Sequence, residues 1–264
     1  MLYNLGQLVR YRGLIQSLVA RELKARYRGS VLGFFWSFIN PLLLLSIYSF
    51  VFAVVLPDTH SKEVEPYALF LFCGILPWTW FSASLAESAG ALIAGGNLIK
   101  KVLFPAEVLP LVSVLANMLH FFLGLPILAV FLIYYRHWPD PLDLLWFPVT
   151  VLVQLVFTAA LALVLSALMV HFRDLRDILS NVLTLWFFAT PIIYWIKEAP
   201  GLGKRVLDFN PMTHLIVSYQ EILFFSGPMG NWRWLLAMGG ASVLLFLGGY
   251  WLFDRLRDSF AEQV

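Results

Sequence analysis

Uncharged stretches long enough to cross a membrane recur along the chain. Six of them contain no Asp, Glu, Lys or Arg, namely residues 29–57, 66–86, 108–135, 144–172, 178–196 and 234–253. An apolar helix of about 20 residues spans the hydrocarbon core of a bilayer. The segment from Pro41 to Leu56 is apolar on every face, whereas the strands of a membrane β-barrel alternate apolar and polar residues. The pattern therefore predicts an all-α integral membrane protein with six transmembrane helices. We place them at residues 31–56, 67–91, 108–135, 144–170, 178–196 and 233–253, in a single transmembrane domain of residues 1–264.

The segments before the first span and after the fifth span have patterns of their own. In residues 1–30, apolar side chains recur at helical spacing and cations lie on the other faces, which predicts an amphipathic helix in the membrane interface. Gly29 and Gly33 then permit a sharp bend into the first span. Residues 199–228 are apolar but are interrupted by proline, glycine and charge. Because broken backbone at membrane depth needs protein or water around it, we expect short re-entrant helices there, between spans five and six.

The composition agrees with a membrane protein. The chain is 60% hydrophobic and 13% charged, whereas soluble domains contain about 25% charged residues. Its formal net charge of +2 is too small to indicate nucleic-acid binding. Cys73 is the only cysteine and lies in the second span, which excludes an intrachain disulfide.

The positions of the cations predict the orientation. If the N-terminus is cytoplasmic, twelve of the eighteen Lys and Arg residues fall on cytoplasmic segments, in agreement with the positive-inside rule. An even number of spans then places both termini of this multi-pass protein in the cytoplasm. Arg21, Lys24, Arg26 and Arg28 crowd the entrance to the first span. Two interpretations of them stay open, an orienting signal alone or an additional site for an anion.

Reactive groups do not converge in this sequence. The five histidines are scattered, without metal-ligand spacing. His120 lies within a span, and we interpret it as a hydrogen-bonded structural residue of the bundle interior. Glu87 is expected to reach the inner interface and to pair with Lys100 or Arg28. The segment "GLGK" at 201–204 lacks the spacing of a phosphate-binding loop. The chain is therefore predicted to hold no metal and not to be an enzyme.

Six motifs, in this order, make the chain similar to a known family over nearly its full length. They are "RELKARYRGSVLGFFWSFINPLL" (21–43), "GILPWTWFSASL" (74–85), "NLIKKVLFPAEVLP" (97–110), "FRDL" (172–175), "TPIIY" (190–194) and "NPMTHLI" (210–216). The chain resembles the membrane subunits of type-2 ABC exporters that move polysaccharides, the O-antigen, capsule and teichoic acid export permeases.

The resemblance implies a homodimer in the bacterial inner (cytoplasmic) membrane, bound to two copies of a separate ATPase subunit. ATP and Mg²⁺ would bind to that partner, so no cofactor is expected on this chain. A coupling helix at 95–106 would press against the ATPase, and residues 199–228 would form an outer gate. The residues expected to contact the ATPase are Asn97, Lys100, Lys101, Phe104, Arg173 and Asp174.

The resemblance also implies the substrate, a polysaccharide carried on undecaprenyl pyrophosphate, and O-antigen is the leading assignment. The protein would also be in contact with membrane lipid. Cations would hold the pyrophosphate by charge-assisted hydrogen bonds, and aromatic rings would stack on sugars. The candidate portal for the lipid consists of Arg21, Lys24, Arg26, Arg28, Gly29, Leu32 and Gly33. The candidate aromatic residues of the channel are Trp36, Tyr48, Trp78, Trp80, Phe81, Trp186, Phe187 and Tyr194. Trp and Tyr also anchor helices at membrane interfaces, and this role stays open for at least half of the set.

Two alternatives remain open at this stage. A type-2 permease for capsule, teichoic acid, a drug or a small lipid would share the fold, and an exporter of drugs or small lipids would not need a polymer-wide aromatic channel. A membrane-bound glycosyl or lipid transferase would need paired acidic or metal-binding residues at an interface, and the sequence does not display them.

Overall fold

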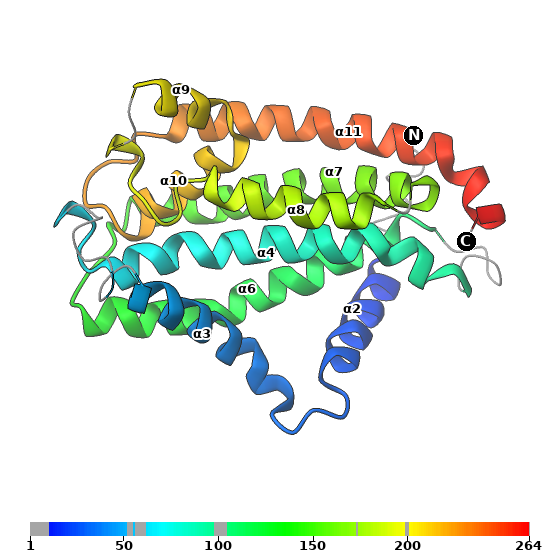
Figure 1. The fold of residues 1–264 in the computed structure, drawn as a ribbon, viewed down its shortest axis with the longest axis horizontal. Coiled ribbons are helices and arrows are strands. Elements are labelled where there is room, and N and C mark those ends of the chain that lie inside the picture. Colours follow the sequence, from blue (N-terminus) through cyan, green and yellow to red (C-terminus); the bar gives the residue numbers. More distant parts are fainter. Residues whose placement is uncertain are drawn as a thin grey trace.

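The structure, a computed structural model, describes residues 11–51, 55, 62–97, 105–172, 174–198 and 201–263, and these form a bundle of helices (Figure 1). The α-helices are α2 (Arg12–Tyr27), α3 (Trp36–Phe50), α4 (Tyr67–Ala94), α6 (Val108–Tyr134), α7 (Phe147–His171), α8 (Leu175–Phe188), α9 (Gly201–Phe209), α10 (Pro211–Leu223) and α11 (Trp232–Gln263). Short 3₁₀ helices are η1 (Gly33–Phe35), η4 (Lys62–Val64), η5 (Asp143–Trp146) and η6 (Ile196–Glu198). Because the described residues contain no strand, the predicted all-α class is confirmed.

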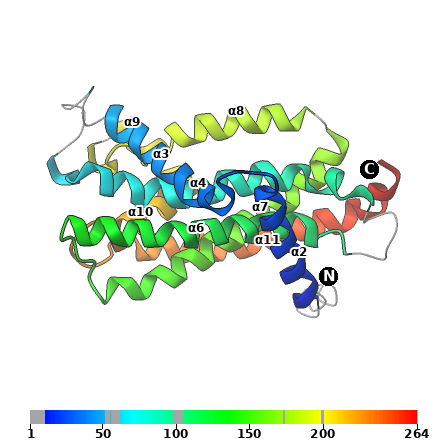
Figure 2. The same ribbon diagram turned by 90° about the horizontal axis from the view of Figure 1, so that it is seen from below.

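Four long helices, α4, α6, α7 and α11, form the body of the molecule (Figures 1 and 2). The segments long and apolar enough to cross a membrane are Tyr67–Ala94, Val108–Tyr134, Asp143–His171 and Trp232–Arg257. They match four of the six predicted spans. At the other two places, α3 has 15 residues and α8 has 14, and part of the predicted span 31–56 lies outside the described residues. The structure therefore has four full-length candidate spans and two shorter helices, and the count of six stays a prediction.

The helix α8 ends before residue 196, where the sequence pattern places the end of the fifth span. Its last residue is Phe188, and Thr190 and Pro191 follow. Proline has no N–H to continue a helix and disfavours helical backbone at the preceding residue. The chain turns here instead, and the N–H of Ile192 donates to the carbonyl of Thr190 at 2.7 Å.

The helices α2 and α3 form a V whose tip points away from the long helices (Figure 1). Gly29 and Gly33 lie at this tip with φ angles of 81° and 47°, a region of backbone conformation that favours glycine. The predicted bend at these two glycines is therefore confirmed. Val31 and Phe35 are exposed, so the tip presents apolar side chains outward.

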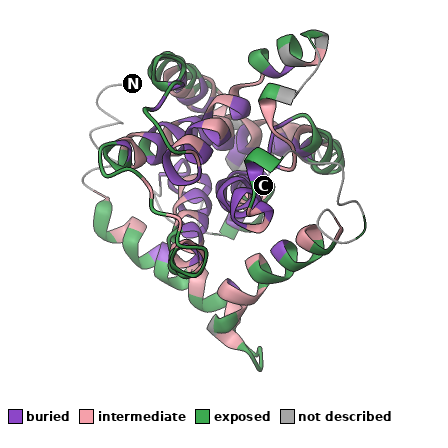
Figure 3. Ribbon diagram, turned by 90° about the vertical axis from the view of Figure 1, so that its left-hand side faces the viewer, coloured by how far each residue is buried: buried purple, intermediate pink, exposed green. Residues whose placement is uncertain are grey.

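Aromatic side chains around α4 fill the core of the bundle, where buried residues gather (Figure 3). Phe81 stacks on Phe157 with ring centroids 5.8 Å apart, and Trp80 contacts Phe121 at 5.2 Å. Cys73 lies in the same helix and is buried. Close packing, more than exclusion of water, holds membrane helices together, and these interlocking rings provide it.

The segment 199–228 contains the two short helices α9 and α10. They lie at the end of the bundle opposite the C-terminal end of α11 (Figure 1). Leu215, Ile216 and Tyr219 of α10 are fully buried and belong to the same core as α4. The re-entrant position of these helices in the membrane stays a prediction.

Candidate functional site

A large cavity opens between α3, α4 and α8, with parts of α2 and α6 at one end. Its volume is about 1320 Å³, above the range of about 300–1,000 Å³ that small-molecule pockets occupy. Tyr48, Trp78 and Phe187 line it beside the middle of α4, while Arg21 and Arg176 line it toward the end of α4. The cavity is therefore aromatic at one end and charged at the other.

Three of the eight predicted channel aromatics line this cavity. The ring centroid of Phe187 lies 5.6 Å from that of Tyr48 and 5.7 Å from that of Trp78. The three rings come from α3, α4 and α8, so the fold brings together residues that are far apart in the sequence.

The other five predicted aromatics do not line the cavity. Trp80 and Phe81 are buried in the core, because they lie on the side of α4 that faces α6 and α7, and Trp80 Nε1 donates to the carbonyl of Val114 at 3.2 Å. The remaining three donate hydrogen bonds elsewhere. Trp36 donates to Ser30 and Tyr194 donates to the Phe188 carbonyl, both nearby in the sequence, and Trp186 donates to Asn210, 24 positions away.

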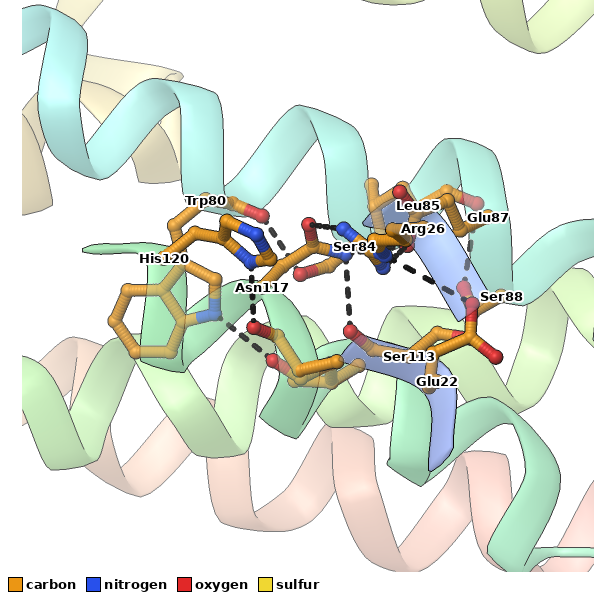
Figure 4. Close-up of polar contacts among 12 residues, drawn as sticks. Glu22, Arg26, Trp80, Ser84, Leu85, Glu87, Ser88, Ser113, Asn117 and His120 are labelled. Atoms are coloured by element: carbon orange, nitrogen blue, oxygen red, sulfur yellow. Dashed lines mark hydrogen bonds and ion pairs between the residues drawn. The ribbon is translucent and has the colours of Figure 1, made fainter. Parts of the chain in front are cut away.

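The four predicted portal cations have different environments. Arg21 is exposed and lines the charged end of the cavity. Lys24 and Arg28 are exposed on and just after α2. Arg26, by contrast, points into the bundle and is paired (Figure 4). Gly29, Leu32 and Gly33 lie at the tip of the V. Cations available to a ligand are thus Arg21, Lys24 and Arg28.

Arg26 is the centre of a polar cluster, here called the Arg26 cluster, formed with Glu22, Glu87 and Asn117 (Figure 4). Its Nη2 contacts the Glu87 carboxylate and its Nη1 donates to Asn117 Oδ1 at 3.0 Å. Asn117 Nδ2 donates to Glu87 Oε2 at 2.6 Å. Glu22 Oε1 is further away, 3.8 Å from Arg26 Nε. The cluster fastens α2 to both α4 and α6.

Of the two partners predicted for Glu87, Arg28 was wrong, because α2 turns Arg26 toward the bundle while Arg28 is exposed beyond the end of that helix. Lys100, the other predicted partner, lies outside the described residues. Asn117 was not predicted as a site residue at all, since an asparagine in an apolar helix gives no sign of its partners.

His120 has hydrogen-bond partners at both ring nitrogens. Its Nδ1 lies 2.9 Å from the Ala116 carbonyl and its Nε2 contacts the hydroxyl of Tyr27, which also contacts Ser37. The interpretation of His120 as a satisfied structural histidine is confirmed. Since Tyr27 ends α2, Ser37 lies at the start of α3 and His120 belongs to α6, these contacts hold the two helices of the V together next to its tip and join them to α6.

A second polar junction lies at the C-terminal end of α8, around Asn210. Its Oδ1 accepts from Trp186 Nε1 at 2.7 Å and from the Met212 N–H at 3.0 Å. Its Nδ2 donates to the Ala189 carbonyl at 2.7 Å and to Thr190 Oγ1 at 3.0 Å. Asn210 caps α10 and ties it to the end of α8. An asparagine before a proline is a known helix-start signal, but its contacts to α8 could not be predicted from this pattern.

Most residues expected to contact the ATPase fall outside the described part of the chain. These are Lys100, Lys101, Phe104 and Arg173. Asn97 is exposed at the last described position before that gap, and Asp174 is exposed at the start of α8. Within the described ranges, no three His, Cys, Asp or Glu side chains gather as metal ligands would.

Known proteins match this chain over most of its length. Residues 13–224 match the family described as ABC-2 type transporter. The chain is 44% identical over 260 residues to an O-antigen export system permease protein of Myxococcus xanthus, covering 98% of each chain. A protein of that description from Klebsiella pneumoniae is 35% identical over 263 residues, covering 99% of this chain and 98% of its own. A polysialic acid transport protein of Escherichia coli is 25% identical over 224 residues, covering 78% of this chain and 80% of its own.

Proposed function

The chain belongs to the ABC-2 type transporter family, and we propose that it is the permease of an exporter that moves lipid-linked O-antigen polysaccharide across the bacterial inner membrane. It is a transport subunit and not an enzyme, and an ABC ATPase on a separate chain hydrolyses ATP. The observation that carries the substrate assignment is the 44% identity to an O-antigen export permease over 98% of both chains. A capsule polysaccharide export protein of Neisseria meningitidis is 24% identical over 80% of this chain, which favours O-antigen over capsule.

We further propose that two copies of the chain enclose the pathway. The helices α3 and α8 flank the cavity, and both expose large apolar side chains, among them Ile47, Leu185 and Phe188. A second copy that covered these faces would close the cavity and bury these apolar side chains. The aromatic end would then contact sugars, and the charged end would face the lipid pyrophosphate. On this proposal residues 95–106 contact the ATPase, and α9 and α10 gate the outer side.

Export of O-antigen is tested by removing the gene and restoring it. We expect cells without it to lose polysaccharide from the surface and to accumulate it inside, since the permease is the membrane pathway. Surface labelling and fractionation with an antibody against the polymer measure both. A normal amount of surface O-antigen in the deletion strain would refute the proposal, and loss of capsule with O-antigen intact would move the assignment to capsule.

The portal is tested with Arg21, Lys24 and Arg28 all replaced by glutamine and Arg26 retained. Each cation near an anionic surface contributes about 1 kcal/mol, so the triple variant is expected to lower export about tenfold or more. Replacing Arg233, a cation at the start of α11 and at the opposite end of the bundle, is the control. Topology mapping must show the normal orientation. If correctly oriented triple variant exports at the wild-type rate, these cations serve only to orient the first span.

A further inference from the structure

Glu107 is a buried carboxylate at the start of α6, three residues after the end of segment 98–104, which lies outside the described residues. Its side chain is only 3% exposed. Arg257 Nη2 lies 3.1 Å from Oε2, and the hydroxyl of Tyr250 donates to Oε1 at 3.3 Å. Both partners belong to α11, 143 and 150 positions away in the sequence. The carboxylate therefore joins the end of the predicted coupling segment to the last helix of the bundle.

Packing around this pair connects the same elements. One cluster contains Leu92 before the segment, Ala106 at its end and Leu109 after it, all buried together with Phe253 and Phe260 of α11. Both ends of the predicted coupling segment thus pack against the C-terminal part of α11. Phe253 is the last residue of the apolar stretch 234–253, and Phe260 lies beyond it.

The helix α11 is in turn packed tightly against α7. A Cβ atom at Gly249 would lie 3.0 Å from the carbonyl oxygen of Ala160, which is tighter than an ordinary van der Waals contact, so the two backbones meet at close range. Since interiors packed this closely transmit strain, a displacement of α11 is expected to act on α7.

Apolar contacts between helices can slide, but the Glu107 carboxylate is withdrawn from water and needs a cation beside it. Arg257 supplies that cation, although 34% of its own side chain is exposed. Removing Arg257 would leave the buried carboxylate uncompensated, which is unfavourable, so the two side chains are expected to stay together when the elements that carry them move.

We propose that Glu107 is a positioning residue that transmits movement of segment 95–106 to α11 through Arg257 and Tyr250. This inference rests on the proposed function, in which that segment contacts the ATPase. On this inference α11 moves during transport. Loss of the Glu107 contacts should therefore lower the amount of polymer exported per ATP without stopping ATP hydrolysis.

The test uses the complete exporter, permease and ATPase together, in vesicles supplied with lipid-linked polysaccharide. Glu107→Gln and Arg257→Gln are each expected to lower polymer exported per ATP hydrolysed about tenfold, because each removes one charge of the ion pair. ATP hydrolysis itself is expected to continue. The double variant is expected to be no worse than either single variant, because both remove the same interaction. Arg257→Lys, which keeps the cation, should retain most of the export.

Arg255→Gln is the matched control. Arg255 lies two positions from Arg257 on α11, and its guanidinium sits over the ring of Trp251 at 5.5 Å, so export per ATP should be unchanged. If Glu107→Gln and Arg257→Gln lower only abundance and thermal stability, with normal export per ATP in the surviving complexes, Glu107 is merely structural and the inference fails. Losses that multiply in the double variant would overturn it as well. A wild-type exporter that moves no polysaccharide would refute the proposed function instead.

Discussion

Replacing Asn210 with alanine is expected to lower the free energy of unfolding of the protein by about 3 kcal/mol, the combined effect of losing a helix cap and the side-chain hydrogen bonds to the end of α8. Asn210 caps α10 and also holds Trp186 Nε1 and the Ala189 carbonyl at the end of α8. The turn at Thr190 and Pro191 lies beyond the end of α8, and the bond from the Thr190 N–H to the Phe187 carbonyl at 3.1 Å does not replace the contacts to Asn210. Thermal unfolding in detergent, followed by the near-UV signal of the tryptophans, measures the loss.

Two further variants make the Asn210 experiment specific. Asn210→Asp keeps the acceptor for Trp186 and the cap, but it cannot donate to Ala189, so it should lie between wild type and Asn210→Ala. Asn181→Ala changes an exposed asparagine on α8 and should leave stability within about 0.5 kcal/mol of wild type. Equal stability of the Asn210→Ala and Asn181→Ala proteins would show that the Asn210 junction is not a structural support.

Removal of the Glu87 carboxylate is expected to release α2 from the bundle. In Glu87→Ala, Arg26 keeps Asn117 but loses its charged partner, which costs about 2 kcal/mol for a hydrogen bond to a charged group. The side chain of Glu87 is 38% exposed, so solvent moderates the effect on global stability. The effect on the local opening of α2 is larger than the effect on global stability. Hydrogen exchange across residues 12–27 should therefore accelerate at least about tenfold.

The control for the Glu87 variant is Glu22→Ala. Glu22 also lies beside Arg26, but at 3.8 Å and with 44% of its side chain exposed, so its removal should barely change exchange in α2. Export is measured for both variants, with a large loss expected for Glu87→Ala alone. Unchanged exchange in Glu87→Ala would show that apolar contacts of Leu18 and Val19 with α6 hold α2 by themselves.

The spans could be predicted wherever a single helix forms all the hydrogen bonds that its own backbone needs. Four uncharged stretches became long helices with ends close to the predicted ones, because hydrocarbon thickness and helix geometry set the length. The prediction was less accurate where tertiary contacts decide. α8 stops at Phe188 although its apolar stretch continues to Ile196, and the polar partners of the turn come from Asn210, in a different motif.

The candidate site could be predicted only in part, for a similar reason. Arg26 follows Val19 by seven residues and Leu18 by eight, so helical periodicity places it on the buried face of α2. The sequence pattern could have distinguished it from the three other cations. Its pairing with Glu87 and Asn117 could not be predicted, because it depends on how α2 crosses α4 and α6. The same holds for the aromatic residues of the cavity. Trp78 and Trp80 lie on different sides of α4, and which side lines the cavity depends on the helices that pack against α4.

The burial of Cys73 has a practical consequence for following motion in this protein. The chain has one thiol, and that thiol is enclosed in the α4 core, so water-soluble maleimide and nitroxide reagents should react with it slowly. Cysteines introduced at the exposed positions Val31 and Trp251 can therefore be spin-labelled in the otherwise native sequence. Pulsed electron resonance between these two labels, recorded with and without nucleotide on the ATPase, would give the distance distribution between the tip of the V and α11 in each state.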